Sequence, residues 1–261
     1  MFYLGRAYYV VWGAGQALLL FLIVVLFRSR NYRHYPFFTA YCVGNLSQSV
    51  TVLFALRFWG QSLITTEIGW VAVIVTLGAR IMAIAELTEH ILAKYRGIWG
   101  VAWRFIAAGV AGVSCYSFAV ANWRWYLGFP SAERLIALAL AAFIAMLFVF
   151  CRYYRLPISR PNRLMAIAFF VYSGTVVINQ SLLEKYYSRY GQYWNLTTTA
   201  VFVICVTLWG AALWTPVPEG ETGSHTLPRG VYGALSPEIN DRLRALDERL
   251  AKFWSSSRKK K

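Results

Sequence analysis

Charged residues are scarce in this chain of 261 residues, where Asp, Glu, Lys and Arg together make up 14%. A soluble domain contains roughly a quarter of such residues. Hydrophobic residues instead make up 58% of the chain. A soluble domain of this length could not bury so much apolar surface, whereas lipid can cover it. The composition therefore predicts an integral membrane protein.

The sequence also lacks the motifs of common cofactor and catalytic sites. It has no Walker-type glycine loop, no H-E-x-x-H motif and no C-x-x-C pair among its four cysteines. The last hydrophobic segment contains no lysine for a retinal Schiff base, and two of the three histidines lie outside the hydrophobic segments, where they cannot ligate a haem inside a bundle. We therefore expect neither retinal nor haem, and we predict a non-catalytic protein.

Hydrophobic segments recur along the chain, and each is long enough to cross a bilayer as a helix. At about 1.5 Å per residue, they match the ~30 Å thickness of the hydrocarbon layer. The predicted spans are residues 7–27, 36–58, 68–92, 105–122, 135–151, 164–183 and 196–214. The predicted fold class is all-α, a bundle of seven transmembrane helices. Seven-helix receptors and bacterial sensor modules share this topology, but architecture alone does not give function.

Lys and Arg in the connecting loops predict the orientation of these spans. Three loops on one side carry ten of them, the loops on the other side carry six, and the carboxyl tail adds nine to the first side. Because cytoplasmic loops are enriched in Lys and Arg, the tail is predicted inside and the amino end outside. The net charge of +15 then suits anionic lipid head groups, so we expect the bilayer as partner and no nucleic acid. The expected location is a plasma membrane or a bacterial inner membrane.

Arg80 is the most informative polar residue of the predicted spans. A charge near the middle of a span costs at least ~2.5–3.5 kcal/mol on insertion scales, so Arg80 should face the protein interior. Candidate partners on other helices are Asn45, Gln48, Tyr172 and Asn179. They could form a pocket for an anion or a polar head group. Alternatively, they could form hydrogen bonds between helices that only fix the packing.

A second polar cluster lies at the inner end of the same span, where Glu86, Glu89 and His90 are spaced to share one helix face. A histidine titrates near neutrality, so the cluster could respond to protons or gate the bundle. It could also form ion pairs with Lys94 or Arg96. A metal site would need carboxylates from neighbouring helices. The other predicted spans contain no Asp or Glu, so we assign no metal ligand.

The carboxyl tail changes in composition after the last span. Residues 216–235 are predicted to form a flexible linker, 236–255 an amphipathic helix and 256–261 a basic tail. Apolar residues at alternating spacings of four and three form one face of that helix. This face could pair with a second copy or another membrane subunit, or lie on the membrane surface. The predicted contact residues are Ile239, Leu243, Leu246, Leu250, Phe253 and Trp254.

The sequence leaves several functions open. The leading hypothesis is a membrane module that either senses a ligand in its bundle or serves as a subunit of a larger assembly through its tail helix. The alternative is a transporter or channel for a small polar or anionic solute, with the cluster around Arg80 as the polar path. A lipid-modifying enzyme is third.

Overall fold

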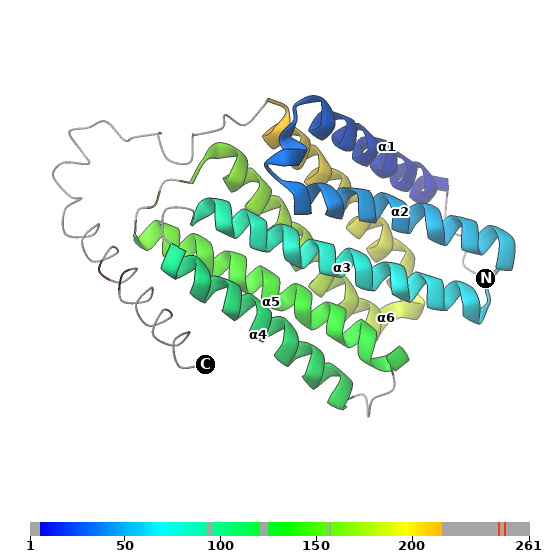
Figure 1. The fold of residues 1–261 in the computed structure, drawn as a ribbon. Helices are drawn as coiled ribbons and strands as arrows, with labels where there is room; N and C mark the ends of the chain where they lie inside the picture. The colour runs from blue at the N-terminus through cyan, green and yellow to red at the C-terminus, as the bar shows by residue number, and fades with distance from the viewer. Residues whose placement is uncertain are drawn as a thin grey trace.

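The computed structural model describes residues 6–92, 96–120, 125–154, 156, 158–215 and the single residues 245 and 248. All regular structure in these residues is helical, as the fold class predicted (Figure 1). The elements are α1 (Arg6–Arg28), the short 3-10 helix η1 (Asn31–Arg33), α2 (Pro36–Trp59), α3 (Leu63–Ile91), α4 (Arg96–Val120), α5 (Trp125–Tyr153) and α6 (Arg160–Leu213). The predicted linker, tail helix and basic tail lie outside the described residues, apart from two isolated positions, and stay predictions.

Helix α6 contains two of the predicted spans. A straight helix of its 54 residues would be about 81 Å long. Instead, Trp209 Nε1 donates to the Met165 carbonyl at 3.4 Å, and Cys205 Sγ approaches the Ala168 carbonyl at the same distance. These contacts show that residues 160–182 and 194–213 pack side by side in opposite directions, as two neighbouring spans would (Figure 1).

Among the described residues, six segments are long and apolar enough to cross a membrane, and they indicate a membrane-embedded bundle. They are Tyr9–Arg28, Leu63–Ile91, Ile98–Val120, Ser131–Tyr153, Arg160–Leu182 and Trp194–Leu213. Helix α2 has 24 residues and packs along α3, but it is not among these six. Its polar residues, such as Asn45 and Gln48, lower its mean hydropathy. The count of seven spans and the direction of insertion therefore stay predictions.

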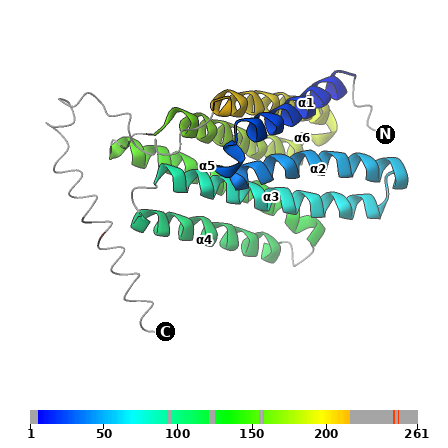
Figure 2. The ribbon, with the colours of Figure 1, turned by 45° about the horizontal axis from the view of Figure 1, so that its top comes forward.

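The core of the bundle is formed by α1, α2, α3, α5 and both halves of α6. At its centre the Trp209 ring lies 5.4 Å from Phe38, 4.9 Å from Phe169 and 5.9 Å from Tyr41, measured between ring centroids. Helix α4 lies at one edge of the bundle (Figure 2), and its main contacts are with α5. The aromatic packing thus fixes how α2 and the two halves of α6 meet.

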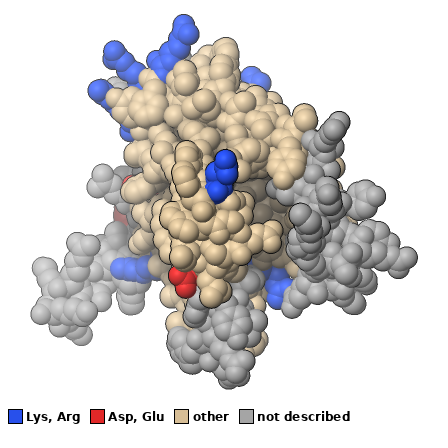
Figure 3. Space-filling view, turned by 90° about the vertical axis from the view of Figure 1, so that its right-hand side faces the viewer, with Lys and Arg blue, Asp and Glu red and all other residues tan. Residues whose placement is uncertain are grey.

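Apolar side chains also cover the outside of the bundle. Large side chains such as Phe54 and Phe58 of α2, Val71 of α3 and Phe105 of α4 are exposed. Seen from the end where α2 meets α3, the described surface is mostly uncharged, with a few separated charged side chains (Figure 3). An exposed apolar surface of this extent marks an interaction site, and lipid is the partner that fits a bundle of apolar helices.

Candidate functional site

Arg80 lies inside the bundle, on the part of α3 that faces α6. Its side chain is 4% exposed, and its guanidinium carbon lies 5.6 Å from the centroid of the Tyr172 ring. The atoms Nε and Nη2 are buried and have no hydrogen-bond partner among the described residues. A buried charge without a polar partner is costly, so this arrangement needs an explanation.

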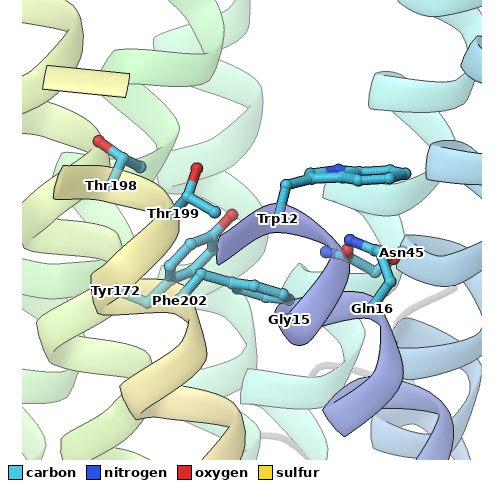
Figure 4. Close-up of a pocket in the computed structure, with 8 residues that line it drawn as sticks. All are labelled: Trp12, Gly15, Gln16, Asn45, Tyr172, Thr198, Thr199 and Phe202. Carbon is cyan, nitrogen blue, oxygen red and sulfur yellow. The ribbon is translucent and has the colours of Figure 1, made fainter. Parts of the chain in front are cut away.

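A cavity of about 150 Å³, partly open to the surface, lies between α1, α2 and the two halves of α6. A cavity of this size can hold a molecule as large as benzene, or a few waters if its walls are polar. The lining residues are Trp12, Gly15, Gln16, Asn45, Tyr172, Thr198, Thr199 and Phe202 (Figure 4).

Polar groups lie on two sides of this cavity. In Figure 4 the amides of Gln16 and Asn45 are seen on one side, and the hydroxyls of Tyr172 and Thr199 on the other. The Phe202 ring lies between these two sides. Amides and hydroxyls both donate and accept hydrogen bonds. The cavity is therefore suited to a small ligand with polar groups at its ends and an apolar middle.

The sequence grouped Arg80, Asn45, Gln48, Tyr172 and Asn179 as one polar site, and the structure places them as follows. Asn45 and Tyr172 line the cavity, and Tyr172 also stacks against Arg80. Gln48 and Asn179 are half-buried and do not line it. The Asn179 Oδ1 atom is buried without a hydrogen-bond partner among the described residues.

Sequence reasoning missed the contributions of α1 and of the second half of α6. Gln16 interrupts the first hydrophobic segment, which was a visible signal, and its buried Oε1 has no hydrogen-bond partner within the described chain. Thr198 and Thr199 gave no such signal, because a threonine in a helix can satisfy its hydroxyl within the helix itself. Each of these hydroxyls does bond to a carbonyl one turn earlier. Threonines of this kind occur widely in helices.

A second set of polar contacts joins the helices near the C-terminal end of α3, the helix that carries Arg80. The Glu86 side chain is 6% exposed, and its two oxygens accept hydrogen bonds from the backbone N–H groups of Phe37 and Phe38, at 3.1 and 2.9 Å. These N–H groups belong to the first turn of α2 and have no partner within the helix. A carboxylate there also interacts favourably with the helix dipole. Glu86 therefore ties the end of α3 to the start of α2.

Aromatic side chains extend this junction. The His90 ring stacks on Tyr35 at 4.8 Å and meets His34 edge-on at 4.4 Å. The Tyr35 hydroxyl donates to Asn162 Oδ1 at 2.6 Å, which connects the start of α2 to the start of α6. Burial and, less strongly, the charge of Glu86 raise the pKa of the Tyr35 phenol. Tyr35 therefore stays protonated and keeps donating.

The end of α6 reaches the same junction. Asn31 Nδ2 donates to the carbonyl oxygens of Leu213 and Thr215, at 2.9 and 3.1 Å. These carbonyls lie at or just after the last turn of α6, where carbonyl groups lack partners within the helix. The junction therefore holds η1, α2, α3 and both ends of α6 together.

The predicted cluster of Glu86, Glu89 and His90 is only partly assembled. Glu86 and His90 share the junction, where the His90 Nδ1 atom lies 2.9 Å from the Glu86 carbonyl oxygen. Glu89 is exposed. Within the described residues no group of three or more His, Cys, Asp or Glu side chains could hold a metal ion.

One expectation about acidic residues needs correction. We expected no Asp or Glu in the spans other than the third, but α5 begins before the predicted segment and places Glu133 inside the candidate span Ser131–Tyr153. Its Oε2 atom accepts a hydrogen bond from Gln180 Nε2 of α6 at 2.9 Å. The predicted span begins at residue 135, because Glu133 and Arg134 are charged, and Glu133 was therefore assigned to a loop.

No protein-family model, no curated protein and no solved structure matches the chain. Its function is therefore argued from the geometry of the cavity and its surroundings.

Proposed function

We propose that this chain is a non-catalytic membrane module that binds a small polar ligand inside its helix bundle, in the manner of a sensor or receptor. The observation that carries the proposal is the cavity between α1, α2 and α6, which is walled by polar groups on two sides. One of its lining residues, Tyr172, also contacts the buried Arg80, whose Nε and Nη2 have no hydrogen-bond partner among the described residues. Ligand sites in bundles are concave, largely apolar and equipped with a few placed polar groups.

The lining chemistry favours binding over catalysis. General acid–base catalysis relies on groups that titrate near the working pH. The eight lining residues supply amides, hydroxyls and aromatic rings, and none of the eight is a carboxylate, an imidazole, an amine or a thiol. Such groups orient a ligand by hydrogen bonds.

The same helices that form the cavity also meet in the junction, which gives ligand binding a way to act at a distance. Helix α2 contributes Asn45 to the cavity and its first turn to Glu86. Helix α6 contributes Tyr172 to the cavity and Asn162 to Tyr35. A ligand that binds one arrangement of these helices more tightly shifts the population toward it. The junction, on the predicted cytoplasmic side, would shift with it.

A transporter for a small polar or anionic solute is the second candidate, and the depth of the polar groups favours it. Arg80 lies six residues from Glu86 along α3, about 9 Å at the rise of a helix. Tyr172 lies ten residues from Asn162 along α6, about 15 Å. Arg80 thus lies at a depth between the junction and the cavity, so polar groups recur through the bundle.

Filling the cavity tests the proposal. Thr199→Trp places an indole ring in the cavity, whereas Thr207→Trp places the same ring on an exposed position of the same helix. A library of small polar molecules is screened for compounds that raise the thermal unfolding midpoint of the full chain in nanodiscs. We expect the compounds that stabilise the wild type to stabilise Thr207→Trp equally and Thr199→Trp not at all.

Two results would count against this function. If the compounds stabilise Thr199→Trp as well as the wild type, they bind elsewhere and the cavity is not the site. If the wild-type chain in liposomes carries such a compound across the bilayer, and Thr199→Trp stops the flux, the transporter is the correct function.

A further inference from the structure

The two unpartnered nitrogens of Arg80 lie on one edge of the guanidinium. Nε and Nη2 each direct an N–H group from that edge, and the two groups are parallel and in one plane. This fork matches the two oxygens of a carboxylate or a phosphate group, which it binds with two hydrogen bonds. Both atoms are buried, and neither has a hydrogen-bond partner among the described residues.

No described residue accepts a hydrogen bond from this edge of Arg80. The Tyr172 ring lies 5.6 Å from the guanidinium carbon and offers its π-face, which compensates part of the charge but accepts no hydrogen bond along the edge. The buried Tyr41 hydroxyl of α2 lies near Arg80, Asn45 and Tyr172. None of these groups forms a hydrogen bond of ordinary geometry with it among the described residues.

Two described carboxylates of the neighbouring helices are engaged elsewhere. Glu86 accepts from the backbone of α2, and Glu133 accepts from Gln180. Among the described residues, the guanidinium edge and the buried phenol are therefore left without an anion. Because leaving a buried charge unpaired is costly, a group that brings negative oxygens into this place would be bound strongly.

We propose that Arg80 and Tyr41 form the anchor for an anionic group, a carboxylate or a phosphate, and that the ligand of the cavity carries this group. Tyr172 is shared by the two places, since it lines the cavity and stacks on Arg80. The inference rests on the proposed function and specifies its ligand class. The anionic group belongs either to a soluble molecule or to a lipid head group, since both offer the same oxygens to the fork.

The test measures the thermal unfolding midpoint of the full chain in nanodiscs of neutral phosphatidylcholine, at constant ionic strength. The probes are acetate, benzoate and inorganic phosphate, and the neutral amides acetamide and benzamide serve as controls. The variants are Arg80→Gln, which removes the charge, and Tyr41→Phe, which removes the phenol hydroxyl. Arg57→Gln removes the same charge from an exposed position on α2 and serves as the matched control.

We expect at least one anion to raise the wild-type midpoint saturably, while its neutral amide does not. Arg57→Gln should behave like the wild type. Arg80→Gln should weaken the apparent affinity for the anion at least about a hundredfold, because the charge and two hydrogen bonds are lost, and Tyr41→Phe should weaken it about tenfold, because a single hydrogen bond to a charged group is lost.

The proposal is overturned if the anions and amides give the same wild-type midpoints, or if Arg80→Gln binds the anion as tightly as the wild type. If Arg80→Gln does not fold, Tyr41→Phe decides, and an unchanged anion affinity in that variant overturns the proposal. If neutral polar compounds bind in the cavity but no anion binds at Arg80, the proposed function stands and the anion site is wrong. If anions bind at Arg80 but no compound binds in the cavity, the anion site stands and the proposed function is wrong.

Nanodiscs with anionic phosphatidylglycerol identify the source of the anionic group. If the lipid head group occupies Arg80, soluble anions will no longer raise the midpoint in these discs, and native mass spectrometry will show a retained lipid that Arg80→Gln loses. If the soluble anions keep their effect, the ligand is a soluble molecule. Both results support an anion site at Arg80.

Discussion

Replacing Glu86 with glutamine tests whether the junction stabilises the bundle. The carboxylate accepts two hydrogen bonds from the first turn of α2, from Phe37 and Phe38. Glutamine keeps one acceptor oxygen, so one N–H group loses its partner and the favourable interaction with the helix dipole disappears. A hydrogen bond to a charged group contributes about 1.5–3 kcal/mol, and a charge at a helix N-terminus contributes roughly 0.3–1 kcal/mol. We therefore expect a loss of about 2–4 kcal/mol in the free energy of unfolding.

The assay is equilibrium unfolding of the full chain in mixed detergent micelles, followed by circular dichroism. The matched control is Glu89→Gln, which makes the same substitution at an exposed position of the same helix. It should change the free energy by no more than about 0.5 kcal/mol. If Glu86→Gln is as stable as Glu89→Gln, the two backbone contacts contribute nothing and the junction does not hold α2 to α3.

Two further substitutions test other contacts of the junction. Tyr35→Phe removes the donor to Asn162 and leaves a buried acceptor unpaired, which should cost about 1–3 kcal/mol in the free energy of unfolding. The control Tyr153→Phe, at an exposed position, should be neutral in the same unfolding assay. Equal stability of the two variants would contradict this role of Tyr35. Asn31→Ala removes the two hydrogen bonds to the end of α6 and should speed amide hydrogen exchange in the last turns of α6. Exchange in α5 should stay unchanged. If exchange is unchanged in both helices, Asn31 does not hold the end of α6 in place.

Much of the fold could be predicted because hydropathy is a property of each segment by itself. An apolar run of sufficient length has to be a helix in a bilayer, since only a helix satisfies its own backbone hydrogen bonds. The helical class and six apolar segments follow from this rule. Helix ends were harder to place. Polar and charged residues continue a helix beyond its apolar part, and for this reason Glu133 of α5 was assigned to a loop.

The candidate site could be predicted only in part. Arg80 was singled out because a charge in a span is expensive wherever its helix lies. The residues around it depend on which helices become neighbours. Tyr172 and Asn45 were named from their depth, whereas Gln16, Thr198 and the cavity between them became visible only with α1 packed against the second half of α6.

The sequence by itself determined that the chain forms apolar helices and that Arg80 has to face inward, because the cost of exposing charge or backbone to lipid does not depend on the other helices. The tertiary structure decided which groups Arg80 meets. Packing brings the Tyr172 ring to the guanidinium, and no described residue accepts a hydrogen bond from its Nε or Nη2. It also places the Glu86 carboxylate on the first turn of α2. These pairings join residues that are distant in sequence, and hydropathy or spacing along one helix contains no information about them.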